Sequence, residues 1–169
     1  FINKKENSSI VLYFFEKLAA HEKMVLGYSL NDLVEFLKVL KSGDLELIVN
    51  YFGMDRFEKL VLTYGYKPLS EIAKHAKPGQ IHSILNSLTD YRNIITQQNI
   101  TKIGLSIAEI TRDVGIALSD EFLRGVKSEE ELYERANEIR KTANKVEYYT
   151  VQGLNSMGYF GAFIAGIFF

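Results

Sequence analysis

Three histidines and one run of carboxylates are the side chains of this sequence whose types could bind a metal or move protons. His75 and His82 are seven residues apart, but Pro78-Gly79 between them breaks any shared helical face. No carboxylate stands at a paired ligand spacing beside them, and His21 lies far away in the sequence. We therefore expect solvent-exposed or core-edge histidines, with a metal site as the alternative.

The carboxylate run Glu129-Glu130-Glu131 follows Ser128 directly. A serine before three acidic residues is typical of a helix start, where the hydroxyl accepts from free backbone N–H groups and the helix dipole favours negative charge. We interpret the run as a helix cap, with metal binding or acid–base chemistry as the alternative.

The motifs of common catalytic sites are absent from these 169 residues. There is no Cys, so thiolate nucleophiles, thiolate metal sites and disulfides are excluded within them. No Gly-Lys-Ser/Thr phosphate loop and no Gly-x-Ser-x-Gly elbow occurs. We expect a non-enzymatic protein without cofactor, metal or small-molecule substrate. A carboxylate site assembled in space is the enzymatic alternative.

Composition indicates one globular domain over residues 1–169, either a fragment of a longer helical protein or divergent from one. The chain is 47% hydrophobic, which is enough for a real core. Its formal net charge of -1 supplies no general attraction for phosphate backbones, so we do not expect nucleic-acid binding.

Apolar residues recur at helical spacing along most of the chain, and we find no convincing strand pattern. The pattern predicts an all-α fold, an irregular bundle of about eight to ten helices. The longest helix of the first half is expected from Gln80 to Lys102, after a break at Lys77-Pro78-Gly79. Helix-start signals are expected at Ser29, Ser106, Ser119 and Ser128.

Two further features bear on partners. Asp90 and Arg92 fall on the predicted long helix, away from most of its apolar stripe, where they could face a partner as a charge pair. The short motif Leu85-Asn86-Ser87-Leu88 has an echo at Leu154-Asn155-Ser156-Met157, which suggests a repeated helical unit.

Residues 148–169 carry no formal charge and allow two interpretations. The length and the small residues Gly158, Gly161 and Gly166 suit a membrane span. However, Gln152, Asn155 and Ser156 are polar, and the apolar stretch that remains is too short to cross the hydrocarbon. We favour a buried or interfacial helix.

From the predicted long helix onward, the order of features resembles the C-subunit family (the d-subunit family in eukaryotes) of A-type and V-type rotary ATPases. The similar stretches are Asp90-Tyr91-Arg92-Asn93-Ile94, Gly104-Leu105-Ser106, Leu118-Ser119-Asp120-Glu121-Phe122-Leu123, Ser128-Glu129-Glu130-Glu131-Leu132, the helix from Ser29 to Leu40, and Phe163-Ile164-Ala165-Gly166. The similarity runs loosely over residues 24–135.

The resemblance implies a non-catalytic component of the central stalk. Members form a funnel-shaped helical socket on the cytoplasmic face of a membrane, between the c-ring and the central shaft. It implies that Asp90, Arg92 and Asn93 orient the helix that lines the socket. The interaction residues of the apolar end, near the ring, are expected to be Gly158, Gly161, Phe163, Phe168 and Phe169.

The alternative function is a membrane-associated helical structural or assembly protein, such as a secretion-platform or virion component. In that case residues 148–169 lie in or on the bilayer.

Overall fold

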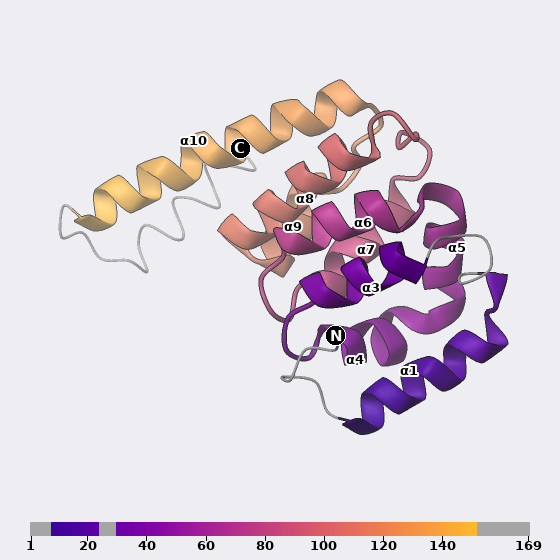
Figure 1. Ribbon diagram of the computed structural model, residues 1–169. Helices are drawn as coiled ribbons and strands as arrows, with labels where there is room; N and C mark the ends of the chain where they lie inside the picture. Colours follow the sequence, from indigo (N-terminus) through magenta and orange to yellow (C-terminus); the bar gives the residue numbers. More distant parts are fainter. Residues whose placement is uncertain (1–7, 24–29, 152–169) are drawn as a thin grey trace.

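The computed structural model describes residues 8–23 and 30–151 (Figure 1). This part of the chain is helical and has no strand, which confirms the all-α prediction. The elements are α1 (Ser8–Ala20), α3 (Leu30–Val39), α4 (Asp44–Glu46), the π-helix η1 (Leu47–Gly53), α5 (Met54–Tyr64), α6 (Tyr66–Lys74), α7 (Ile81–Asp90), α8 (Ile100–Val114), α9 (Ile116–Leu123) and α10 (Glu129–Val151).

Helices α3, α6, α8 and α10 lie next to one another in that order, so the bundle has a central row of helices (Figure 1). Helix α7 packs against η1 and α8, and α5 packs against η1 and α6. Helix α1 lies at one end of the bundle and α10 at the other (Figure 1). Apolar side chains from all these layers form one continuous core.

Aromatic residues fill the centre of this core. The rings of Phe36, Phe57 and Tyr66 come from α3, α5 and α6, and each residue is at most 1% exposed. The ring of Phe36 lies 5.4 Å from that of Phe57 and 5.9 Å from that of Tyr66, in tilted arrangements that aromatic pairs favour. The N-terminal half of the bundle is therefore tied together through Phe36.

Single glycines turn the chain between consecutive helices. Gly65 joins α5 to α6 and Gly115 joins α8 to α9, each with φ of 87°. That conformation is strained for residues with a Cβ atom. These glycines let two helices follow each other without a loop, which keeps the bundle compact.

The prediction of one helix from Gln80 to Lys102 is wrong. Helix α7 ends at Asp90, residues 91–99 form turns, and α8 begins at Ile100. The break has a local cause, because the Thr96 N–H donates to Asn99 Oδ1 at 2.6 Å and the Asn99 N–H donates to Thr96 Oγ1 at 3.2 Å. This reciprocal pair has the pattern of a capping box and holds a non-helical turn just before α8.

Two of the predicted helix starts are also wrong. Ser106 lies inside α8 and Ser119 inside α9, where its hydroxyl donates to the Ile116 carbonyl at 3.0 Å. A serine can satisfy its hydroxyl on a carbonyl of the preceding turn, so serine alone does not mark a helix start. Ser29 lies outside the described residues.

The predicted start at Ser128 is confirmed, because α10 begins at Glu129. The Ser128 hydroxyl accepts from the Glu131 N–H at 3.1 Å, and the Glu131 carboxylate accepts from the Lys127 N–H at 3.0 Å. The acidic run therefore caps α10, as interpreted from the sequence.

Candidate functional site

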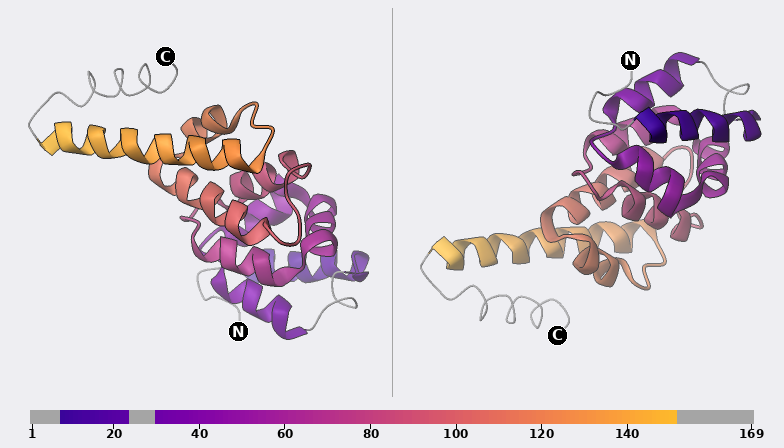
Figure 2. Two further views of the ribbon diagram at one scale, coloured as in Figure 1. Left: turned by 90° about the horizontal axis from the view of Figure 1, so that it is seen from above. Right: turned by 90° about the horizontal axis from the view of Figure 1, so that it is seen from below.

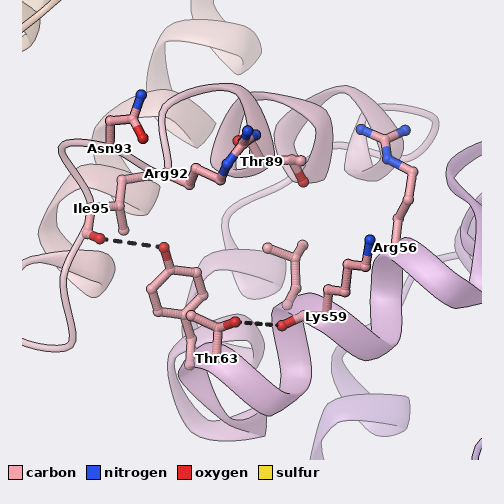
Figure 3. A pocket seen from close by; sticks show the side chains of 9 residues that line it. Arg56, Lys59, Thr63, Thr89, Arg92, Asn93 and Ile95 are labelled. Atoms are coloured by element: carbon pink, nitrogen blue, oxygen red, sulfur yellow. Dashed lines mark hydrogen bonds between the residues drawn. The ribbon is translucent and has the colours of Figure 1, made fainter.

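A pocket of about 630 Å³ opens between α5 and the segment that follows α7 (Figure 3). Three of its nine lining residues are cationic, namely Arg56, Lys59 and Arg92, and no carboxylate is among the nine. The other lining residues are polar or apolar: Leu60, Thr63, Tyr64, Thr89, Asn93 and Ile95. The pocket is therefore electropositive.

One wall of the pocket is a single face of α5. Arg56, Lys59 and Thr63 recur at intervals of three and four residues, which places them on one side of the helix. The carboxylates of α5 turn elsewhere: Glu58 Oε2 lies 2.7 Å from His21 Nδ1, and Asp55 Oδ1 lies 3.3 Å from His21 Nε2. His21 thus contacts the two carboxylates of α5 that could otherwise form ion pairs with Arg56 and Lys59.

The opposite wall consists of the end of α7 and the turn after it. Thr89, Arg92, Asn93 and Ile95 face α5 across the pocket (Figure 3). The Tyr64 hydroxyl donates to the Ile95 carbonyl at 3.3 Å, and the Gln97 amide donates to the Thr63 carbonyl. These two hydrogen bonds fasten the turn to the end of α5 and fix the distance between the walls.

The turn is also braced from behind. The Asn99 side-chain amide donates to the Ile94 carbonyl at 2.9 Å and to Glu129 Oε2 at 3.1 Å. The Tyr91 hydroxyl donates to the Leu123 carbonyl. Side chains at both ends of the turn therefore hold Arg92 and Asn93 in place at the pocket.

The arginines of this pocket differ from the other arginines of the chain in having no ion pair with a described carboxylate. Four of the six arginines of the chain lie within ion-pair distance of a carboxylate: Arg112 with Asp113, Arg124 with Glu121, Arg135 with Glu131, and Arg140 with Glu109. Arg56 and Arg92 are the two that have no carboxylate within 4 Å in residues 8–23 and 30–151, and both line the pocket.

Arg56 and Arg92 are instead oriented by neutral groups. The Arg56 guanidinium lies 4.4 Å from the centre of the Phe52 ring, a cation–π contact, and its Nη1 is 3.5 Å from the Phe52 carbonyl. Arg92 Nη1 donates to the Thr89 carbonyl at 3.2 Å. Since a guanidinium carries five N–H groups, most of its donors stay available to a ligand.

Electrostatics within the pocket follow from these positions. Burial raises the pKa of Tyr64 above its ordinary value of 10, and the positive charge of Arg92 acts in the opposite direction. Tyr64 therefore stays protonated at neutral pH and can donate to Ile95.

Two of the interaction residues predicted from the sequence lie at this pocket. Arg92 and Asn93 line it, whereas Asp90, the exposed last residue of α7, does not. Asp90 has no ion pair with Arg92. The pKa of Asp120 is raised mainly by burial and, to a lesser extent, by the negative charge of Asp90. The other five predicted interaction residues lie outside the described residues: Gly158, Gly161, Phe163, Phe168 and Phe169.

Arg56 and Lys59 were missed at the sequence level. Asp55 and Lys59 are four residues apart, a spacing at which helical side chains commonly form an ion pair, and such a pair would neutralise Lys59. In the structure Asp55 contacts His21 instead. A signal was present in the repeat of cation, cation and hydroxyl at positions 56, 59 and 63.

The histidines and carboxylates form no metal centre in the part of the chain that the structure describes. His75 is exposed, and the ring of the half-buried His82 lies 6.2 Å from that of Tyr51. None of the described helices has both the length and the apolar character needed to cross a bilayer.

A second polar cluster, formed by Lys41 and Asp44, lies where the turn between α3 and α4 meets the end of α6. Asp44 is fully buried, and its Oδ2 accepts from the Lys41 N–H at 2.7 Å. Lys41 Nζ donates to the carbonyls of Ala73 and Lys74 at the end of α6, at 2.5 and 2.9 Å. Burial raises the pKa of Asp44 above its ordinary value, against the effect of the Lys41 N–H. This cluster joins α3 to α6.

Comparisons with known proteins return nothing: no family model, no curated protein and no solved structure matches the chain. The helical fold and the electropositive pocket are thus the features from which a function can be argued.

Proposed function

We propose that the protein is a non-catalytic binding protein and that the pocket between α5 and α7 holds an anionic group of its ligand. The observation that carries this proposal is the pairing of the arginines: the two that lack a carboxylate among the described residues line one pocket, together with Lys59.

Charge favours an occupant of opposite sign. Three cations around one concavity repel one another, and an anion between them relieves this repulsion. Guanidinium groups bind carboxylate or phosphate oxygens through two parallel hydrogen bonds, which are about twice as strong as bonds between neutral groups. The unused N–H groups of Arg56 and Arg92 supply these donors.

The lining groups support binding more than reaction. The nine described lining residues include no histidine, carboxylate or thiol, and their three hydroxyls already donate to backbone carbonyls. Histidines, carboxylates and thiols are common general bases and nucleophiles, and the one lining amine, that of Lys59, belongs to an exposed residue. We therefore assign the pocket to recognition.

Calorimetric titration with inorganic phosphate tests the proposal. Ionic strength is kept constant with sodium chloride, because salt screens exposed charges. We expect Arg92→Gln to weaken phosphate binding about 10-fold, a loss of about 1.4 kcal/mol. Arg124→Gln is the matched control, since Arg124 pairs with Glu121 away from the pocket, and it should bind as the wild type does. Equal affinities of Arg92→Gln and wild type would overturn the proposal.

The resemblance noted in the sequence supports a second candidate. We propose that the chain couples other subunits of a membrane-bound rotary ATPase, the c-ring and the central shaft, on the cytoplasmic face of the membrane. The observation in its favour is that Arg92 and Asn93, two residues of the similar stretch, are exposed on a braced turn where a partner can reach them.

Mass spectrometry of proteins captured from native membranes tests this second candidate. Recovery of rotary ATPase subunits supports it, and their consistent absence contradicts it. Detergent dependence separates it from the alternative of a membrane-associated structural or assembly protein, because a chain that stays monodisperse without detergent argues against an anchor in the bilayer.

A further inference from the structure

We infer that the pocket recognises a phosphate monoester carried on a polyhydroxylated body, as in a sugar phosphate. This inference rests on the proposed anion-binding function and names the class of its ligand. Three features of the pocket lead to it: its size, the state of its hydroxyl groups and the distribution of its charge.

The size of the pocket calls for more than a free anion. A volume of about 630 Å³ lies within the range of roughly 300–1,000 Å³ typical of sites for whole organic ligands. A lone phosphate would leave most of this space to water. The anionic group should therefore belong to a larger molecule that reaches the remaining walls.

The hydroxyl groups of the pocket are set to accept hydrogen bonds. Thr63 donates to the Lys59 carbonyl at 2.6 Å and Thr89 donates to the Leu85 carbonyl at 3.1 Å. Tyr64 likewise donates to the Ile95 carbonyl. While these bonds are made, the oxygen lone pairs of each hydroxyl are open to a donor on a ligand.

Acceptors in the lining need donors on the ligand. Sugar and polyol hydroxyls supply such donors, whereas the oxygens of a fully ionised phosphate do not. Leu60 and Ile95 add apolar surface against which the carbon skeleton of such a body can pack. A polyhydroxylated body therefore suits these walls of the pocket.

The three cationic side chains of the pocket come from both of its walls, so a phosphate between the walls could contact them. Arg56 and Lys59 project from α5 and Arg92 from the facing segment, with Thr89 next to Arg92 (Figure 3). Three positive charges balance a doubly charged monoester better than a singly charged diester or carboxylate. Asn93, on the same wall as Arg92, adds a neutral amide whose N–H groups can donate to the ligand.

Calorimetry on the full chain with inorganic phosphate, glucose and glucose 6-phosphate tests the inference. We expect glucose 6-phosphate to bind at least ~10-fold more tightly than inorganic phosphate, and glucose to give no measurable heat. Arg92→Gln should weaken binding of both phosphate compounds.

Threonine variants isolate the contribution of the body. Thr63→Val and Thr89→Val should reduce the preference for glucose 6-phosphate over inorganic phosphate, measured as the ratio of the two affinities in each variant. Thr142→Val is the matched control, because Thr142 on α10 also donates to a carbonyl four residues back but does not line the pocket. The control should keep the full preference.

The outcomes separate this inference from the proposed function. Equal affinity for inorganic phosphate and glucose 6-phosphate overturns the inference and leaves the anion site standing. Absence of binding by both compounds, or binding that Arg92→Gln does not weaken, overturns both. A preference that survives in both threonine variants also contradicts the inference.

A phosphorylated polyol can be a free metabolite or a lipid headgroup, and sedimentation with vesicles distinguishes them. Vesicles containing phosphatidylinositol 4-phosphate are compared with vesicles containing phosphatidylinositol alone. Retention that requires the 4-phosphate and is reversed by glucose 6-phosphate assigns the headgroup. Tight binding of glucose 6-phosphate without retention assigns the soluble compound. Retention that persists in Arg92→Gln contradicts use of this pocket by the lipid.

Discussion

Gly104 of α8 lies directly against Ile72 of α6. A Cβ atom at position 104 would come within 2.1 Å of Ile72 Cδ1, a separation that real Cβ contacts do not show. Ile72 is fully buried, so its side chain has little room to move. The two helices at the centre of the bundle therefore approach as closely as they do because position 104 has no side chain.

Gly104→Ala should destabilise the protein by about 1–3 kcal/mol, the usual cost of overpacking a core. The sign is informative, because the same change in an unconstrained helix stabilises by about 1 kcal/mol. Urea denaturation measures the change in unfolding free energy. The double variant Gly104→Ala with Ile72→Ala should show a favourable coupling between the two sites. Additive effects would show that the two residues do not interact.

Asp44→Asn should flatten the pH dependence of stability above pH 4. The folded pKa of Asp44 is raised by burial, so the native state holds the proton more tightly than the unfolded chain does. The contribution of Asp44 is thus largest below the ordinary pKa of 3.8 and is lost as pH rises through the raised folded value.

Urea denaturation of wild type and Asp44→Asn between pH 4 and 7 checks this sign. The difference in unfolding free energy should shift in favour of the variant as pH rises. Glu134→Gln, at an exposed position on α10, is the control and should follow the wild-type profile. A constant difference between Asp44→Asn and wild type would contradict the assigned effect of burial.

Asn99→Ala should loosen the turn that carries Arg92. The substitution removes the hydrogen bonds to the Thr96 N–H, the Ile94 carbonyl and Glu129, and losing a cap of this kind costs about 1–2 kcal/mol. Hydrogen exchange of the amides of residues 94–100 should become faster. Gln98→Ala, an exposed neighbour, serves as the control and should leave exchange unchanged.

Arg135→Gln should destabilise the junction of α9 and α10. Arg135 Nη1 donates to the Phe122 carbonyl at 2.8 Å and to the Arg124 carbonyl at 2.5 Å, while Nη2 pairs with Glu131 at 2.8 Å. Hydrogen bonds that involve a charged group contribute about 1.5–3 kcal/mol each, reduced here by partial exposure. The thermal midpoint should fall by more than in Lys141→Gln, an exposed site on the same helix. Equal midpoints for Arg135→Gln and Lys141→Gln would show that the bonds of Arg135 to the Phe122 and Arg124 carbonyls do not stabilise this junction.

Local signals in the sequence predicted much of the fold. The all-α class, the break at Pro78-Gly79 and the cap at Ser128 all depend on residues that are close together in the chain. The break after Asp90 was missed, since apolar residues such as Tyr91 and Ile94 continue the helical period through it. Besides the local Thr96–Asn99 pair, hydrogen bonds of Tyr64, Gln97 and Asn99 to segments distant in the chain hold this break.

The pocket itself was not predicted from the sequence. Two of its nine lining residues, Arg92 and Asn93, were named for another role, that of orienting a helix. Arg56 and Lys59 were not named, because whether a lysine is paired depends on which group its neighbouring carboxylate contacts. Asp55 turns to His21, which is 34 positions earlier in the chain. No local pattern in the sequence indicates this contact, which depends on the position of His21, just after α1, against the acidic residues of α5.

Helix α10 extends beyond the rest of the bundle (Figure 2). At 1.5 Å per residue its 23 residues make a rod about 34 Å long, and the far half runs on past α8 (Figure 2). Ile139 is the last buried side chain described on it, and the adjacent Arg140 pairs with Glu109 of α8 at 2.5 Å. Ile139 and the Arg140–Glu109 ion pair are therefore the outermost described contacts that fasten α10 to the bundle.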